Sequence, residues 1–203
     1  DGEASDDESG FSVSLAGNGT VVAVSAHQND GNGTNAGHTR IYAWDGTTWN
    51  QLGNDIDGEA ANDGSGYSVA ISNDGNTVAI GARLNDGNGT DSGQTRIYSW
   101  SGNTWSQLGS DIDGEASDDE SGFSVSLSDD GTTVAIGARQ NDGNGTNSGH
   151  VRVFDLSATS SNPNISAITG ISDNTGGFNT LNFASGVTTV TIAGITYALV
   201  AAH

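Results

Sequence analysis

The chain has 203 residues with neither Cys nor Met, so disulfides, zinc–thiolate sites and cysteine chemistry are excluded. Five Lys plus Arg residues stand against 25 Asp plus Glu residues, and the formal charge of −20 would repel the phosphate backbone of a nucleic acid. The sequence has no run of about 18 apolar residues, so it predicts no membrane span.

One unit of sequence occurs three times with a period of 56 residues. Residues 10–13, 66–69 and 122–125 read Gly-Phe-Ser-Val, Gly-Tyr-Ser-Val and Gly-Phe-Ser-Val, and no insertion interrupts the period. Repetition over a fixed period of this length predicts a tandem-repeat architecture.

The strands of a unit follow from its hydrophobic pattern, and the second unit serves as the example. Apolar residues alternate along 67–72, and an Asp-Gly turn returns the chain along 77–82, which predicts an antiparallel hairpin. A loop rich in Gly and Asn leads to a third strand over 94–100, and a short turn leads to a fourth over 104–108. Each unit is therefore a four-stranded antiparallel sheet, joined to the next by an acidic connector such as 111–122.

The tail departs from the repeat, and Pro163 marks the transition. Residues 186–192 and 195–202, separated by a turn at Ala193-Gly194, predict one further hairpin. Through the run Tyr-Ala-Leu-Val-Ala that begins at Tyr197, this segment resembles the LVIVD-type propeller repeat. Only the first two strands of such a blade are present.

Four-stranded sheets repeated at this period predict an all-β fold of the β-propeller type, in which small residues let the sheets pack face to face. We assign blades to residues 1–56, 57–112 and 113–168, and a partial fourth blade to residues 169–203.

Repeated aromatic and Arg positions receive structural roles. The aromatic residues are expected to form the core between blades, with a sugar-stacking platform as the alternative, and Trp49 and Trp105 are expected to be the most exposed. In an anionic chain without Lys, the Arg residues are expected to pair with connector carboxylates and tie blade to blade. They are Arg40, Arg96 and Arg152 on the third strand, and Arg83 and Arg139 after the second.

Three motifs of the third unit carry a family resemblance. Residues 121–125, 134–138 and 148–154 read Ser-Gly-Phe-Ser-Val, Val-Ala-Ile-Gly-Ala and Ser-Gly-His-Val-Arg-Val-Phe. They resemble the FG-GAP repeat of integrin α-type β-propellers, and the resemblance extends over residues 1–156. It implies a propeller of the kind found in secreted bacterial surface proteins. The family's calcium loop is shortened to Asp-Asp-Gly-Thr at 129–132, so we expect no cation there.

The loop Asn-Asp-Gly-Asn-Gly-Thr, which occurs once in each unit, is the first candidate calcium site. Its glycines would let oxygen donors at alternate positions converge on a hard cation. Each loop has only one or two carboxylates and lacks a bidentate Glu, so an ordered Asx-turn loop is the alternative. The predicted ligands are Asp30, Asn32, Asp86, Asn88, Asp91, Asp142 and Asn144.

The connector is the second candidate calcium site, because its carboxylates repel one another unless a cation or an Arg lies between them. The second unit has fewer connector carboxylates than the third, so a solvated acidic surface is the alternative to a metal cage. The predicted ligands in the third unit are Asp113, Glu115, Asp118 and Asp119.

The sequence contains no Gly-x-Ser-x-Gly elbow, phosphate loop or His-Glu-x-x-His motif, and we predict that the protein is not an enzyme. The predicted function is that of an extracellular structural or adhesion protein. The alternative is a calcium-dependent propeller module that binds glycans or proteins. Five sequons are candidate glycosylation sites, at Asn18, Asn32, Asn88, Asn144 and Asn164.

Three blades and a hairpin leave two sheet faces without partners, and such surfaces pair readily with another chain. The expected partners are therefore copies of the chain joined into a filament, or the missing blades of a longer propeller from which this piece derives. Surface glycans and proteins are the other expected partners.

Overall fold

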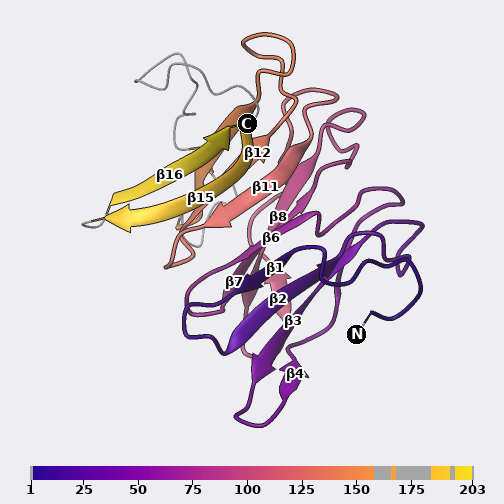
Figure 1. Ribbon diagram of the computed structural model, residues 1–203, viewed down its shortest axis with the longest axis vertical. Coiled ribbons are helices and arrows are strands. Elements are labelled where there is room, and N and C mark those ends of the chain that lie inside the picture. Colours follow the sequence, from indigo (N-terminus) through magenta and orange to yellow (C-terminus); the bar gives the residue numbers. More distant parts are fainter. Residues whose placement is uncertain (1, 158–165, 168–183, 193–194, 203) are drawn as a thin grey trace.

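The computed structural model shows antiparallel β-sheets stacked one on another (Figure 1). It describes residues 2–157, 166–167, 184–192 and 195–202, with side chains for residues 2–157. These residues contain no helix, and the predicted all-β fold of β-propeller type is confirmed. We call the first three sheets blades 1, 2 and 3, and the two-stranded sheet near the C-terminus the terminal hairpin.

Blade 1 consists of β1 (Val13–Leu15), β2 (Val21–Ala26), β3 (His38–Trp44), β4 (Trp49–Gln51) and β5 (Ile56–Asp57). Blade 2 repeats this order with β6 (Ser68–Ile71), β7 (Thr77–Ala82), β8 (Gln94–Trp100), β9 (Trp105–Gln107) and β10 (Ile112–Asp113). Blade 3 consists of β11 (Ser121–Leu127), β12 (Thr133–Ala138), β13 (His150–Asp155) and β14 (Ser166–Ala167). The terminal hairpin consists of β15 (Ala184–Ile192) and β16 (Ile195–Ala202).

The first hairpin of a blade forms as its alternating pattern predicts. In blade 2, β6 pairs antiparallel with β7, and Ile71 lies opposite Val78 beside the turn. The carboxylate of Asp74 closes this turn by accepting hydrogen bonds from the Ser72 hydroxyl at 2.6 Å and the Asn76 backbone N–H at 3.0 Å. Burial raises the pKa of Asp74, but the hydrogen bonds outweigh burial and leave that pKa below its usual value.

The fourth strand of blades 1 and 2 is interrupted, which the hydrophobic pattern does not predict. In blade 1, β4 pairs with the C-terminal half of β3, and β5 pairs with its N-terminal half, where Ile56 lies opposite Thr39. Between them the backbone N–H of Leu52 donates to the Ile41 carbonyl at 2.8 Å. The chain therefore leaves blade 1 beside the start of β3, and the connector to blade 2 begins there.

The blades pack face to face in chain order. Strand β6 packs against β1 and β2, β11 packs against β6 and β7, and β15 packs against β11 and β12. Blade 1 and the terminal hairpin thus lie at opposite ends of the stack (Figure 1). The interface between blades 1 and 2 sets a small residue against larger ones, since Ala23 of blade 1 shares a buried cluster with Val69 and Ile80 of blade 2. The terminal hairpin takes the place of the first hairpin of a fourth blade.

The prediction that Trp49 and Trp105 are both exposed is wrong for Trp105. Trp49 is 42 % exposed, whereas Trp105 is 9 % exposed and donates its indole N–H to the Leu52 carbonyl of blade 1 at 2.9 Å. Gly53 also lies against it, since a Cβ at this glycine would be 3.2 Å from Cδ1 of Trp105. The difference arises because blade 1 covers this side of blade 2, while no blade in the described part of the chain covers the same side of blade 1.

Candidate functional site

The three Asn-Asp-Gly-Asn-Gly-Thr loops are ordered by their own Asx hydrogen bonds. The carboxylate of Asp30 accepts from the backbone N–H of Asn35 at 2.8 Å, and that of Asp86 accepts from Asp91 at the same distance. Asp142 accepts in the same way at 2.6 Å. Three of the predicted calcium ligands therefore organise the turn of their loop. Burial, together with the charge of Asp86, raises the pKa of Asp91.

The loops of blades 1 and 2 also hold the connector of the next blade. Asn32 donates from Nδ2 to the Gly58 carbonyl at 2.7 Å, and Asn88 donates in the same way to the Gly114 carbonyl at 2.8 Å. We call the contact between the loop of one blade and the connector of the next the loop–connector clasp. Calcium binding by the loops stays a prediction. The clasp of blades 1 and 2 is completed by loop backbone carbonyls that accept connector N–H groups, at Thr34, Asn35 and Ala36.

A buried carboxylate–amide pair anchors each connector. Asp63 is 4 % exposed and accepts hydrogen bonds from Asn85 Nδ2 at 3.0 Å and from the Ala60 backbone N–H at 2.9 Å. The pair recurs at the same positions of the other units, as Asp7 with Asn29 and Asp119 with Asn141. The predicted ligand Asp119 therefore belongs to the hydrogen-bond framework of the fold.

The other carboxylates of the blade 3 connector have separate partners and do not converge on one point. Asp113 accepts from Nε2 of Gln94 at 3.3 Å, and a Glu115 oxygen lies 2.7 Å from Nδ1 of His150. Asp118 is exposed and has a φ of 65°. A calcium site in this connector also stays a prediction.

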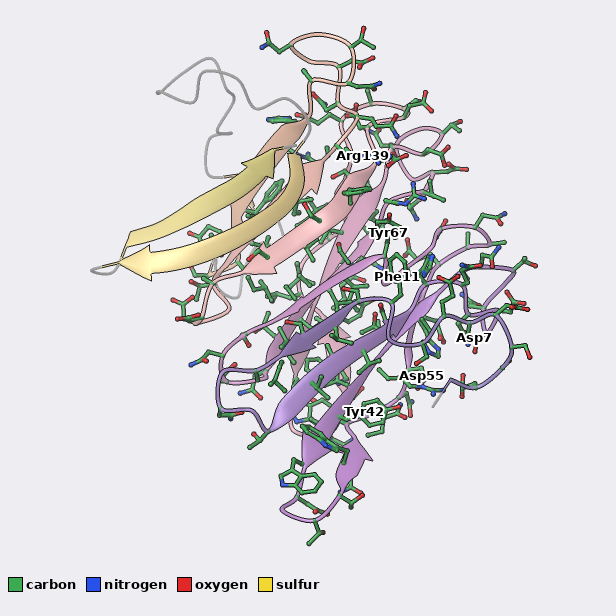
Figure 2. All side chains as sticks on the ribbon, viewed as in Figure 1. Asp7, Phe11, Tyr42, Asp55, Tyr67 and Arg139 are labelled. Carbon is green, nitrogen blue, oxygen red and sulfur yellow. The ribbon has the colours of Figure 1, made fainter. Side chains whose placement is uncertain are left out.

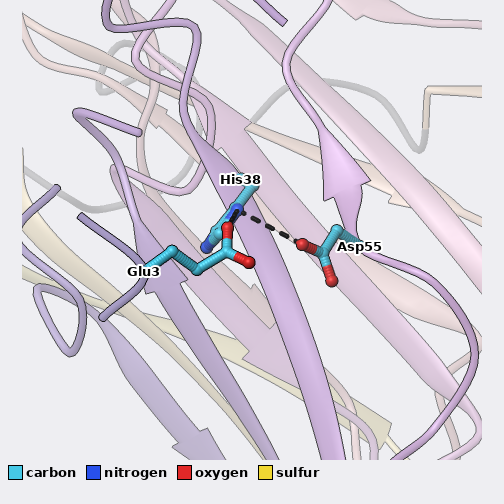
Figure 3. Close-up of side chains that lie close together, drawn as sticks. All are labelled: Glu3, His38 and Asp55. Carbon is cyan, nitrogen blue, oxygen red and sulfur yellow. Dashed lines mark ion pairs between the residues drawn. The ribbon is translucent and has the colours of Figure 1, made fainter. Parts of the chain in front are cut away.

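One convergent cluster of metal-ligating types, in blade 1, was not predicted. Nδ1 of His38 lies 3.6 Å from Asp55 Oδ2 and 3.9 Å from Glu3 Oε2 (Figure 3). In the part of the chain with described side chains, this is the one group of three such residues whose ligand atoms lie within 4.8 Å of one another. The sequence offered one indication of this cluster, which is that Glu3 recurs as Glu59 and Glu115 in the connectors.

The two carboxylates of this cluster already bind a cation of the chain. Arg40 donates from Nε and Nη2 to Asp55 Oδ2, at 3.0 Å each, and pairs with Glu3 through Nη2. The hydrogen bond to Asp55 raises the pKa of Arg40 more than any other contact does. Burial acts to raise the pKa of Asp55, but hydrogen bonds, first of all the one from Arg40, outweigh burial and leave that pKa below its usual value. Because the guanidinium of Arg40 binds both carboxylates, we interpret the cluster as a structural ion-pair network.

The predicted pairing of Arg with connector acids holds in part. Arg40 has the partners described above, and Arg83 and Arg139 both pair with Glu120. On β8, Nη1 of Arg96 also pairs with the connector carboxylate of Glu59, at 3.7 Å from Oε1. The Nη2 groups of the Arg residues of β8 and β13 donate to backbone carbonyls. Those pairs are Arg96 with Asp57 and Arg152 with Asp113.

We expect the variant His38→Gln to weaken the pH dependence of stability. Burial, together with the charge of Arg40, holds the pKa of His38 below 6.5, although Asp55 and Glu3 attract its proton. Between the folded pKa and the unfolded value of 6.5, the unfolded chain binds a proton that the folded chain does not. The free energy of unfolding therefore falls as pH falls through this window, and Gln removes that contribution.

Urea denaturation at about pH 7.5 and about pH 5 measures the effect. Wild type should lose more stability between the two conditions than His38→Gln. Gln94 stands at the equivalent position of blade 2, so the fold already accommodates this side chain. The lowered pKa of His27 is common to both proteins and cancels in the comparison. Equal losses would show that His38 is protonated alike in the folded and unfolded chains.

A column of aromatic rings capped by His and Arg side chains runs through the three blades. The ring centroid of Tyr67 lies 5.1 Å from that of Phe11 and 5.2 Å from that of Phe123. Figure 2 shows Phe11, Tyr67 and Arg139 following one another along this line. Each ring is covered from its own blade, by His27 at 3.9 Å, by Arg83 at 4.4 Å and by Arg139 at 4.4 Å.

Beside the column, a carboxylate fills the interface between blades 2 and 3, whereas a cavity lies in the interface between blades 1 and 2. Between blades 2 and 3, Glu120 accepts from Arg83 Nη1 at 3.1 Å and Arg139 Nη2 at 3.0 Å, and also from Gln140. Between blades 1 and 2 the equivalent residue is Gly64, and a cavity of about 180 Å³ lies beside it. We call it the Gly64 cavity; His27 and Arg83 are among its lining residues.

One apolar face of blade 1 is exposed. Val13 and Leu15 on β1 are 61 % and 60 % exposed, whereas their equivalents in blade 2, Val69 and Ile71, are 7 % and 8 % exposed. The preceding blade covers this face in blades 2 and 3, so blade 1 presents one half of a blade interface. We call it the open face, formed by Phe11, Val13, Leu15, Trp44 and Trp49.

The candidate glycosylation sites differ in their surroundings, and their modification stays a prediction. Asn18 is exposed in the turn between β1 and β2, where its Oδ1 accepts from the Thr20 N–H at 2.9 Å. At Asn32 and Asn88 the glycan would attach to the Nδ2 atom that donates in the clasp. Asn144 is exposed in the loop of blade 3, and Asn164 lies outside the described residues.

The family model described as the FG-GAP repeat matches residues 55–98 and 111–154. No curated protein matches the chain. One similar solved structure is a proposed 6-phosphogluconolactonase of Bacteroides uniformis, with 13 % identity, a TM-score of 0.53, and coverage of 94 % of this chain and 46 % of that one. Another is Sqt1 of Saccharomyces cerevisiae, with 12 % identity, a TM-score of 0.55, and coverage of 91 % and 39 %.

At these identities the likeness to solved structures shows the fold alone, and this chain spans less than half the length of either. Among the residues described, no helix offers a route across a membrane. The two matched segments extend from β5 into β8 and from β10 into β13. Residues 55–98 and 111–154 match the FG-GAP repeat, and the sheets that they form have the fold of β-propeller blades.

Proposed function

We propose that the chain is a non-catalytic extracellular adhesion and scaffold module that assembles through the open face of blade 1. FG-GAP repeats are typical of extracellular proteins. The observation that carries the proposal is the exposure of Val13 and Leu15, whose equivalents in blade 2 are buried under a neighbouring blade. An apolar face of this kind is a site for association.

The proposed occupant is a second copy of the chain, which adds a blade to the stack. Inside the chain, the backbone N–H groups of Val69 and Ile71 donate to the hydroxyls of Ser12 and Ser14 in the preceding blade, at 3.2 and 3.1 Å. Edge strand β1 offers the equivalent N–H groups beside its exposed side chains. A blade of the second copy would supply both the acceptors and the apolar cover.

The end of the second copy that carries the terminal hairpin continues the stack, so we propose a head-to-tail contact. Such a contact is heterologous and does not close on itself unless the rotation between copies completes a ring, so it builds filaments. The formal charge of −20 on each copy opposes association, and salt should therefore favour it.

We expect the double variant Val13→Ser with Leu15→Ser to remain a single chain where wild type forms oligomers. Sedimentation velocity over a series of protein concentrations in about 150 mM salt distinguishes the two states. The variant should keep the far-ultraviolet spectrum of wild type, because side chains that are 61 % and 60 % exposed contribute little to the core.

The matched control replaces the buried equivalents, Val69→Ser and Ile71→Ser. Each should lower the free energy of unfolding by about 2 kcal/mol, because these side chains are almost fully buried. A wild-type protein that sediments as one chain at every concentration, with and without calcium, would contradict the proposed assembly.

A further inference from the structure

We infer that the Gly64 cavity is a binding site for a hexuronate, a carboxylate carried on a small hydroxyl-rich ring such as the acidic sugar of a surface glycan. This inference does not depend on assembly through the open face, because the cavity lies between blades 1 and 2 within one chain. It rests on a comparison of two equivalent interfaces of the same molecule.

The interface between blades 2 and 3 shows what the position accepts. There the Glu120 carboxylate lies between Arg83 of one blade and Arg139 of the next, at 3.1 and 3.0 Å. Gly64 has nearly the same backbone conformation, with a φ of 61° against 51° at Glu120. A Cβ built on Gly64 would meet a single atom within 4 Å, the His27 carbonyl oxygen at 3.9 Å. The space of the missing carboxylate is therefore open.

Two of the three groups that hold the Glu120 carboxylate have donor counterparts at the Gly64 cavity, whereas the counterpart of Gln140 is the apolar Leu84. Arg83 corresponds to Arg139, which binds Glu120 through Nη2. Arg83 itself pairs with Glu120 through Nη1, so its Nη2 is not used in that ion pair. His27 corresponds to Arg83 as the residue from the preceding blade. Nδ1 of His27 is buried without a hydrogen-bond partner, with Glu8 Oε2 at 3.7 Å, and Nε of Arg83 is buried without one, as is Nε of Arg139. A bound carboxylate would accept hydrogen bonds from such donors, and charge-assisted bonds of this type are strong.

The rest of the cavity selects for a polar ring. Its volume of about 180 Å³ exceeds what a carboxylate needs but is below the range of about 300 Å³ and above for drug-sized ligands. The amide side chains of Gln28, Asn35 and Asn62 line it. Amides both donate and accept hydrogen bonds, as sugar hydroxyls do. The Tyr67 ring adds an apolar surface, and Asn62 lies at the exposed rim.

Binding is measured by ligand-observed NMR and calorimetry with glucuronate, glucose and acetate, each titrated to about 10 mM. The protein is the full chain carrying Val13→Ser and Leu15→Ser, which lie outside the cavity lining, so oligomer formation cannot alter the result. We expect glucuronate to bind, acetate to bind at least tenfold more weakly, and glucose to show no binding.

The decisive variants are Gly64→Glu and Gly64→Ala. Both place a side chain at the same positive φ, but only Glu supplies the internal carboxylate that Glu120 supplies in the next interface. Glucuronate should bind Gly64→Glu at least tenfold more weakly than Gly64→Ala. Gly64→Glu should also melt at a higher temperature than Gly64→Ala, because its carboxylate pairs with Arg83.

Four outcomes would overturn the inference. Equal glucuronate affinity in the two variants would place the ligand elsewhere on the molecule. Glucose binding as tightly as glucuronate would remove the role of the carboxylate, and acetate binding as tightly would remove the role of the ring. Absence of glucuronate binding to the parent protein would mean that the cavity is only a gap left by the glycine.

Discussion

The variant Asp63→Ala should lose about 3 kcal/mol of its free energy of unfolding. Asp63 and Asn85 are 4 % and 5 % exposed, and the carboxylate accepts from both the Asn85 amide and the Ala60 backbone N–H. Alanine would leave both donors buried without an acceptor and would open a small cavity. Leaving buried donors unpaired costs more than a formed hydrogen bond gains, so the expected loss is large.

Chemical denaturation monitored by tryptophan fluorescence measures this loss, and Asp129→Ala is the matched control. Asp129 is exposed, and the described hydrogen bond at this residue uses its backbone carbonyl. Its replacement should change stability by less than about 0.5 kcal/mol. A similarly small change for Asp63→Ala would mean that water satisfies the donors and that the carboxylate does not anchor the connector.

The variant Gly114→Ala should destabilise the protein by about 3 kcal/mol through a clash of backbones. A Cβ at Gly114 would lie 1.9 Å from the Ser92 carbonyl oxygen and 2.7 Å from its carbonyl carbon. Neither atom can rotate away as a side chain could, and the Gly114 N–H is held by the Gly93 carbonyl at 2.7 Å. The connector of blade 3 must therefore move away from the loop of blade 2, which opens the clasp.

A thermal scan should show this effect as a fall in Tm of about 6 to 12 °C. Gly102→Ala is the control, because a Cβ there meets no atom within 4 Å although the φ is +92°. Its cost is that of the strained φ alone, about 1 kcal/mol. If the two variants melted together, the close approach of Gly114 to Ser92 would not limit the packing of the blades.

The hairpins could be predicted from sequence because their determinants are local. The alternation along β6 and the Asp-Gly turn after it suffice to pair Ile71 with Val78. The burial of Trp105 could not be predicted, because it depends on Leu52 and Gly53 of the preceding blade, whereas Trp49 has the same local sequence pattern without such a neighbour.

The candidate sites show the same limit. The loops were predicted as possible cation sites or as Asx turns, and the structure reveals a further role, since Asn32 and Asn88 bind carbonyls of the next connector. The cluster of His38 with Glu3 and Asp55 joins residues far apart within the unit. The shortage of carboxylates in the second connector was visible in the sequence. That this shortage leaves a cavity beside Gly64, lined by Arg83, could be known only from the structure.

The loop–connector clasp bears on how the number of 56-residue units in such a repeat protein can change. Backbone carbonyls of Thr34, Asn35 and Ala36 accept backbone N–H groups, so this part of the contact does not depend on which unit follows. Loss or gain of 56 residues by unequal recombination would therefore join two old surfaces and require no new one. Deleting the second unit would bring Glu120 against His27, and the hollow interface between blades 1 and 2 would be replaced by one that contains a carboxylate.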